Sequence, residues 1–201
     1  MSIRLLMTGH ARFFFLDAFF LLWVASLEAG LVTGRIYPMN FLDVERNHLS
    51  TAAGCITVVV LTTTANTTKA RAVGDRIPDF CLANPNYRMI TILNLAGTYS
   101  ALARPFATWL IRQRLSAEAK RLQERYDAKK IARDARRDVF AVADFDGAVT
   151  SQLGAKPEAS EFRVFVFGRD GKLLRQWNDV PSAGELEQAL KPGGTTSVSS
   201  H

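Results

Sequence analysis

The chain has 201 residues, of which 48% are hydrophobic and 22% are charged, and this is the composition of a globular protein with a substantial core. Two cysteines are too few for a disulfide scaffold or a structural zinc site. The three histidines show no pair at ligand spacing, so we expect neither a metal nor another cofactor. The formal net charge of +6 would favour anionic partners if it were spread over one surface.

An apolar stretch lies near the amino terminus, where 22 residues from Phe13 to Gly34 separate Arg12 from Arg35. As a helix it would be about 33 Å long, which matches the hydrocarbon thickness of a bilayer. Basic residues precede it, so the positive-inside rule predicts an anchor (residues 1–33) with the following domain outside the cytoplasm. Asp17 and Glu28 oppose this interpretation. A cleaved signal peptide, or a soluble hydrophobic helix on a cytoplasmic protein, remains open.

Residues 34–190 read as one α/β domain. After a short strand at 40–44, the continuous apolar and β-branched run 55–63 predicts a strand buried on both faces. Asn66 or Thr67 can then cap a helix that continues towards residue 82, with Pro78 expected to kink or restart it. A second buried strand is predicted at 88–95, and a strand, a helix and a strand of these lengths form a parallel βαβ unit.

A long helical region follows at about 102–137. Residues 112–138 contain ten basic and five acidic residues, and apolar residues recur at helical spacing on one side. Nucleic-acid binding is not favoured, because no aromatic stacking set, glycine loop or known motif accompanies the charge. We expect a solvated amphipathic helix, with acidic lipid headgroups as a further contact if the chain is anchored.

The last part of the domain alternates strands and short helices. Strands are predicted at 138–144, 162–167 and 172–177, a short helix or turn at 147–154, a hairpin turn at 168–171, and a final helix at 181–190. Ser182 is a natural helix cap, and Glu185 completes a capping box. The polar residues 191–201 predict a disordered tail.

Several short motifs occur in the order typical of one superfamily. They are the opening Gly34-x-x-x-Pro38 with Phe41-Leu-Asp43, the strand Val58-Val-Val-Leu-Thr-Thr-Thr64, the stretch Asp144-x-Asp146-Gly147, and the hairpin Phe165-Val-Phe-Gly-Arg-Asp-Gly171. The sequence from Gly34 to Leu190 thus resembles the thioredoxin-like superfamily in its peroxiredoxin-related form, the alkyl hydroperoxide reductase and thiol-specific antioxidant type. The resemblance implies a thioredoxin-like fold, with a central mixed sheet flanked by helices and the region 102–137 as an insertion.

The position that carries the chemistry in that family is changed. Peroxiredoxins have Thr-x-x-Cys after the first core strand, where the helix amino terminus stabilises the thiolate. Here the matching residues are Thr64-Ala-Asn-Thr67, so Thr64 matches and Thr67 replaces the nucleophile. No Cys-x-x-Cys is present, and Arg163 lies one residue out of register with the family's arginine. We expect the redox centre to be lost.

Two uses of the site follow. A redox-degenerate domain would bind a protein or a small anion at the helix start, through Asn66, Thr67, Thr68 and Arg163. Alternatively, Cys81 would serve a thiol oxidoreductase or peroxidase with unusual geometry. The other interpretations of Cys81 are a buried structural thiol and a disulfide with Cys55.

A second family resemblance has to be weighed. Val142-Ala-Asp144-Phe-Asp146-Gly-Ala-Val149 is similar to the phosphatase motif of haloacid dehalogenases. That resemblance would make Asp144 the nucleophile and Asp146 the acid/base beside magnesium. Only 57 residues follow Asp144, which leaves little room for the remaining catalytic residues of that family.

Overall fold

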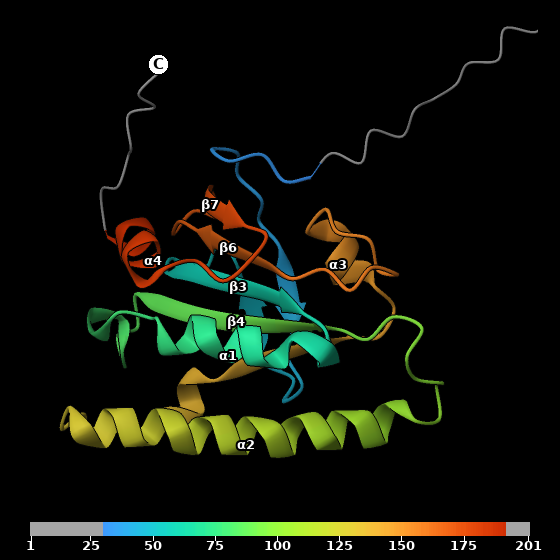
Figure 1. Cartoon of the computed structure of the whole chain (residues 1–201), viewed down its shortest axis with the longest axis horizontal. Helices are drawn as coiled ribbons and strands as arrows, with labels where there is room; N and C mark the ends of the chain where they lie inside the picture. The colour runs from blue at the N-terminus through green and yellow to red at the C-terminus, as the bar shows by residue number, and fades with distance from the viewer. Residues whose placement is uncertain (1–29, 192–201) are drawn as a thin grey trace, which may run out of the picture.

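The protein is described by a computed structural model that covers residues 30–191, and its centre is a five-stranded mixed sheet (Figure 1). The strand order is β5-β4-β3-β6-β7, with bounds Phe140–Asp144, Tyr87–Asn94, Ile56–Thr62, Arg163–Phe167 and Leu173–Trp177. β3, β4 and β5 are parallel neighbours, whereas β6 is antiparallel to both β3 and β7. This confirms the predicted mixed sheet.

β3 is central because its sequence has no polar face. All seven of its residues are buried, and the side chains alternate between two apolar clusters on opposite faces of the sheet. Val59 and Leu61 point to one face, whereas Val58 and Val60 point to the other. A strand buried on both faces fixes the position at which the chain leaves the sheet, directly after Thr62.

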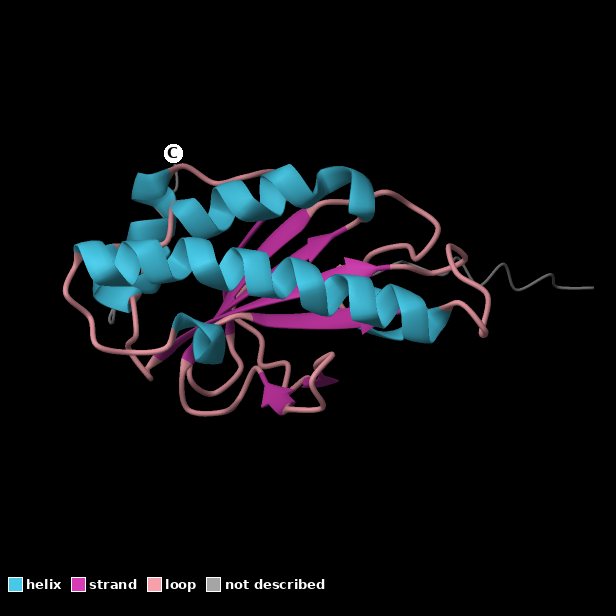
Figure 2. Ribbon diagram, turned by 90° about the horizontal axis from the view of Figure 1, so that it is seen from below, coloured by secondary structure: helices cyan, strands magenta, loops and turns pink. Residues whose placement is uncertain are grey.

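Helices cover the two faces unequally (Figures 1 and 2). α1 (Thr67–Asp75), α2 (Arg104–Ala128) and α4 (Ala183–Leu190) pack on one face. The other face carries α3 (Ala148–Gln152) and a small antiparallel pair, β1 (Asn40–Leu42) with β2 (His48–Ser50). Short 3₁₀ turns complete the order, η1 at Thr64–Asn66, η2 at Asp79–Cys81 and η3 at Ala135–Asp138.

The region predicted as an insertion, 102–137, contains α2 and η3. It joins β4 to β5, two parallel neighbours that need a crossover connection, so this helix belongs to the core topology. Its apolar side packs on the sheet as the spacing predicts, with Leu115, Ala119 and Tyr126 buried. Within residues 30–191, no helix has both the length and the apolar character needed to cross a bilayer.

Local signals set most of the element ends. Ser182 caps α4 through the predicted capping box, since its Oγ accepts from the backbone N–H of Glu185 at 3.2 Å and the Glu185 carboxylate accepts from the Ser182 N–H at 2.8 Å. Gly171 has the positive φ (82°) that its turn requires, whereas Gly168 does not. α1 ends at Asp75, earlier than predicted, and residues 79–81 form a separate turn after Pro78.

The last residues of the apolar amino-terminal stretch belong to the domain. Leu31 is buried in the core cluster beside α3, and Gly34 forms a turn with φ +91°, its N–H donating to the Leu173 carbonyl at 2.7 Å. The predicted helix therefore does not extend through residues 30–34. The rest of the proposed anchor, residues 13–29, and the tail beyond Lys191 lie outside the described residues.

Candidate functional site

The amino end of α1 lies at the carboxyl edge of the parallel strands, where β3 delivers it. Thr64 and Asn66 bound the 3₁₀ turn η1, and α1 begins at Thr67. Asn66 occupies the cap position, but its side chain makes no capping bond and instead donates to the Ser160 carbonyl at 3.4 Å. Thr67 donates its hydroxyl to the Thr64 carbonyl at 3.5 Å. No side chain caps the start of α1, and N–H groups at the start of a helix are donors that suit an anion.

Neither cysteine lies at this site. Cys55 precedes β3 at the opposite edge of the sheet, roughly 23 Å from the strand's other end at 3.3 Å per residue. Cys81 lies in η2, beyond the carboxyl end of α1. Both thiols are free and buried, which agrees with the interpretation of Cys81 as a buried structural thiol and contradicts the alternative of a disulfide with Cys55.

The surroundings of Cys81 suppress its reactivity. The side chain is only 8% exposed and packs in the apolar cluster with Val58 and Val73. Burial raises the pKa of its thiol to about 12, so almost none of it is thiolate at neutral pH. The thiolate is the nucleophile in disulfide exchange and peroxide reduction, and Cys81 is therefore a poor candidate for either reaction.

Arg163 is held away from α1. It shares the β6 face of Phe165, which belongs to the cluster on the other side of the sheet. Its guanidinium donates to the Gly154 carbonyl at 3.1 Å and forms an ion pair with Glu161 at 2.5 Å. The structure thus brings Thr64, Asn66, Thr67 and Thr68 together at one helix end and separates Arg163 from them.

Asp144 has a structural role that does not fit the phosphatase alternative. Its carboxylate is buried and accepts from both the backbone N–H and the hydroxyl of Thr150, each at 2.7 Å. Asp146 is exposed and pairs with Arg104. No cluster of acidic, histidine or cysteine residues within 30–191 could hold a metal ion, and the sheet order is that of the thioredoxin-like prediction.

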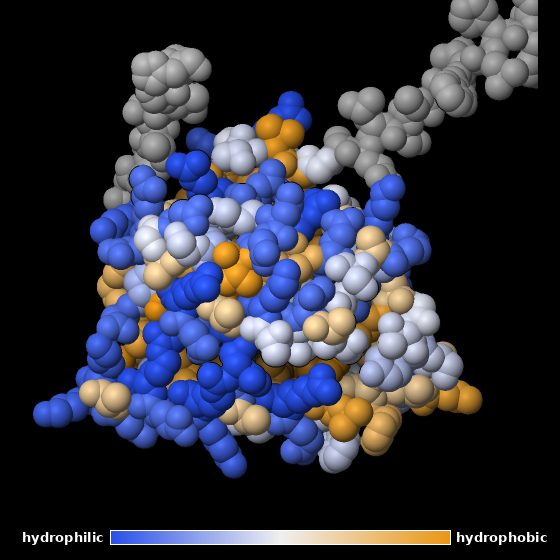
Figure 3. Space-filling view, in the orientation of Figure 1, coloured by the Kyte–Doolittle hydropathy of each residue, from blue (hydrophilic) through white to orange (hydrophobic). Residues whose placement is uncertain are grey.

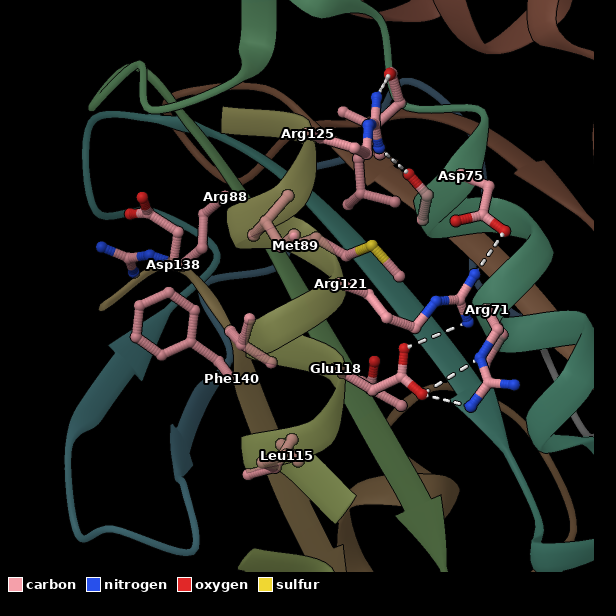
Figure 4. A pocket seen from close by; sticks show the side chains of 18 of the residues that line it. Arg71, Asp75, Arg88, Met89, Leu115, Glu118, Arg121, Arg125, Asp138 and Phe140 are labelled. Carbon is pink, nitrogen blue, oxygen red and sulfur yellow. Dashed lines mark hydrogen bonds and ion pairs between the residues drawn. The ribbon is translucent and has the colours of Figure 1, made fainter. Parts of the chain in front are cut away.

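A cavity of about 870 Å³ lies between α1, α2 and the face of β4, and we name it the α1–α2 trench (Figure 4). Thr64 and Thr67 line one end, and Cys81 and Tyr126 line it beyond the other end of α1. In Figure 3, hydrophilic side chains cover most of this part of the surface, and apolar surface shows only in small areas between them. The predicted site and the predicted alternative thiol therefore border the same cavity without approaching each other.

Ion pairs between the two helices span the trench (Figure 4). Arg71 of α1 donates to Glu118 of α2 through two nitrogens. Arg121 lies between Asp75, at 3.5 Å, and Glu118, at 3.7 Å. Arg125 donates to the Gly74 and Ile77 carbonyls, both at 3.0 Å, and so satisfies acceptors at the carboxyl end of α1.

None of these trench residues other than Thr64, Thr67 and Cys81 was among the predicted site residues. Arg71 and Glu118 are 47 positions apart, and nothing in their local sequence pairs them. The signal that was available is the row Arg114, Glu118 and Arg121, which a helix places on one side at spacings of four and three residues. In the sequence alone, this row indicates only a solvated charged face.

Comparison with solved structures identifies the fold. The solution structure of a Bacteroides thetaiotaomicron protein, named for protein disulfide isomerase, superposes with a TM-score of 0.51 at 11% identity and covers 81% of this chain and 92% of its own. The exposed lipoprotein thioredoxin of Streptococcus pneumoniae strain TIGR4 gives 0.48 at 12% identity, with 77% and 98% covered. The thioredoxin domain of a Bacteroides vulgatus thiol-disulfide oxidoreductase gives 0.48 at 11%, with 81% and 100% covered.

No protein-family model and no curated protein matches the chain. The resemblance therefore extends to the thioredoxin-like fold, and the peroxiredoxin-related form of it stays a prediction. At such low identity the likeness identifies architecture and not activity. The strand order, the position of α1 after β3 and the superposition agree: residues 30–191 have an α/β thioredoxin-like fold.

Proposed function

We propose that this domain is a binding module built on a thioredoxin-like scaffold, without thiol chemistry of its own. The observation that carries the proposal is the threonine at the amino end of α1, together with the burial of both cysteines elsewhere. A hydroxyl does not exchange disulfides, and a buried thiol with a pKa of about 12 supplies almost no nucleophile at pH 7.

The surface proposed for binding is the start of α1, from Thr64 to Thr68. The N–H groups of its first turn have no side-chain acceptor, and the positive end of the helix dipole favours negative charge there. A carboxylate of a protein partner, or a small anion, suits these donors. Arg163 is left out of this proposal, because its guanidinium is already engaged on the other face of the sheet.

We further propose that the apolar run within residues 13–29 tethers the domain to a membrane, with the domain outside the cytoplasm. The support is its length, its composition and the basic residues that precede it. Retention of the chain in the membrane pellet after alkaline carbonate extraction is the expected result. Release into the supernatant would contradict the tether.

Two measurements on the full chain test the binding module. In insulin-reduction and peroxide-consumption assays we expect no turnover above buffer, and the same result for Cys81→Ser. Turnover that the Cys81→Ser variant abolishes would instead establish the oxidoreductase alternative. In a phosphate titration followed by NMR, the amides of Asn66, Thr67 and Thr68 should shift, and unchanged signals would remove the support for an anion site.

A further inference from the structure

We propose that the α1–α2 trench binds a single-chain anionic amphiphile, a molecule of the fatty-acid type with an extended apolar tail. The tail would lie along β4 between the two helices, and Arg121 together with Arg114 would hold the acidic head. The inference goes beyond the proposed function, because it assigns a ligand to a second surface of the domain. It concerns a different surface from the N–H groups at the start of α1.

The floor and walls of the trench suit an apolar tail. β4 contributes Met89 and Leu93, and α2 contributes Leu115 and Leu122. Leu93 and Leu115 are buried, whereas Met89 and Leu122 are only half-buried because α2 does not close completely over the strand. The volume of about 870 Å³ is that of a small-molecule site. A methionine on the floor can adapt to the shape of a flexible chain.

The charge around the trench selects an anionic head. Among the described residues, seven arginines and four carboxylates line it, which leaves an excess of three positive charges. A neutral ligand would gain nothing from that excess, and a cationic one would be repelled. The head group is therefore a carboxylate or a phosphate, the groups that match the guanidinium fork.

Arg121 and Arg114 are the arginines with capacity to bind a head group. The contacts of Arg121 to Asp75 and Glu118 measure 3.5 and 3.7 Å, whereas a strong charge-assisted bond is about 2.8 Å long. Glu118 is already taken by Arg71. Arg114 is exposed and has no ion-pair partner among residues 30–191, and it lies two helical turns from Arg121 on the same side of α2.

Methionine methyl signals give a direct test on the full chain. Met89 reports from the trench, and Met39, buried in the cluster on the opposite face of the sheet, is the internal control. With [methyl-¹³C]methionine, dodecanoate below its micelle concentration should shift Met89 and leave Met39 unchanged. Acetate should shift neither, and uncharged dodecyl maltoside should bind more weakly.

Four variants separate the roles of the residues. Arg121→Gln should weaken dodecanoate binding about ten-fold, the loss expected for one charge-assisted bond. Lys120→Gln removes the same charge from an exposed neighbour outside the trench and should change nothing. Asp75→Asn breaks the ion pair with Arg121 but keeps the arginine, so binding should persist.

Gly74→Leu tests the tail. A Cβ on Gly74 would lie 3.8 Å from the terminal methyl of Met89, so there is room for the Cβ, and the rest of a leucine side chain would extend towards Met89 and take up space in the trench. Binding should be lost while the amide spectrum of the sheet stays that of the wild type. The proposal would be overturned if the Met89 methyl signal did not shift on addition of dodecanoate. It would also be overturned if the Arg121→Gln variant bound dodecanoate as tightly as the Lys120→Gln variant.

Phosphatidylglycerol vesicles form a separate arm of the same titration. A response of Met89 to vesicles without a response to dodecanoate would assign the contact to a membrane surface and overturn the free-amphiphile proposal. Failure of this inference leaves the binding module intact. The binding module is tested separately, by the thiol assays and by the phosphate titration at Asn66, Thr67 and Thr68, so the two failures are distinguishable.

Discussion

At the scale of single residues, the burial of Cys81 has a consequence for stability at high pH. Burial raises the pKa of its thiol from 9.0 to about 12, so the folded protein keeps the proton that the unfolded chain releases. The stabilisation is complete below about pH 9 and is lost progressively between about pH 9 and about 12. We expect the urea midpoint of the wild type to fall from about pH 9 to about 10.

The control for this prediction is Cys81→Ala, which should lose that decline in the same interval. The tyrosines whose pKa is also raised by burial, Tyr87 and Tyr126, have an ordinary pKa of 10.0, so their effect begins at higher pH. A Cys81→Ala variant with an unchanged slope between about pH 9 and about 10 would contradict the assignment.

Tyr126 joins three segments through one hydroxyl. The side chain is 1% exposed, its O–H donates to Asp138 at 2.8 Å, and its oxygen accepts from the Ala83 N–H at 3.0 Å. Ala83 has a positive φ of 55°, and this bond helps to hold that conformation. Tyr126→Phe should lower the free energy of unfolding by about 1–3 kcal/mol, because two hydrogen bonds to half-buried groups are lost, at about 0.5–1.5 kcal/mol each, while Asp138 keeps its bonds from Arg133.

Tyr99→Phe is the matched control. Tyr99 is half-buried against Phe145, and none of the described residues hydrogen-bonds its hydroxyl. Its replacement should change the free energy of unfolding by less than about 0.5 kcal/mol. Equal losses in the two variants, measured by urea unfolding, would show that the Tyr126 hydroxyl contributes nothing.

At the scale of elements, α1 and α2 are joined by the ion pair between Arg71 and Glu118, which is exposed to solvent. Their side chains are 47% and 35% exposed, so water and salt screen the attraction. A double-mutant cycle with Arg71→Ala and Glu118→Ala should give a coupling energy of about 0.2–1 kcal/mol that shrinks in 1 M salt. A coupling energy above that range and insensitive to salt would mean that the pair is effectively buried.

Element positions were predictable wherever one local signal dominated. The unbroken apolar run of β3, the capping box at Ser182 and the turn at Gly171 each appeared where expected. The end of α1 was less predictable, because the helix signal continued to residue 82 while the chain changes direction at Pro78. Propensity alone does not show where packing ends a helix.

Only one part of the candidate site, the start of α1, could be predicted from the sequence. The start of α1 follows from the strand that precedes it, so Thr64 and Thr67 could be placed together. The trench depends on how closely α2 approaches β4, and no local pattern sets that distance. Arg163 illustrates a third case, because it was predicted among the binding residues although it lies one residue out of register, and that shift turns its side chain to the face of β6 opposite α1.

At the scale of the whole molecule, the scaffold retains what a reactive cysteine would need while lacking the cysteine. A central strand buried on both faces leads into a helix whose first N–H groups are unsatisfied by side chains. That electrostatic environment should act on any thiol placed there. Thr67→Cys should therefore have a thiol pKa below about 7.5, lower than the ordinary 8.5, because the helix amino end stabilises the thiolate.

The control is Thr98→Cys, the same substitution in an exposed turn between β4 and α2. Its pKa should remain near about 8.5, and the two can be compared through the pH dependence of iodoacetamide alkylation with both native cysteines replaced by serine. Equal pKa values would mean that the amino end of α1 does not stabilise negative charge. The proposed anion site would then lose its physical basis, and so would the argument that a thiol at position 67 is activated. A depressed pKa at position 67 alone would show that the start of α1 stabilises negative charge, and that a single side chain, Thr67, decides whether a reactive thiol stands there.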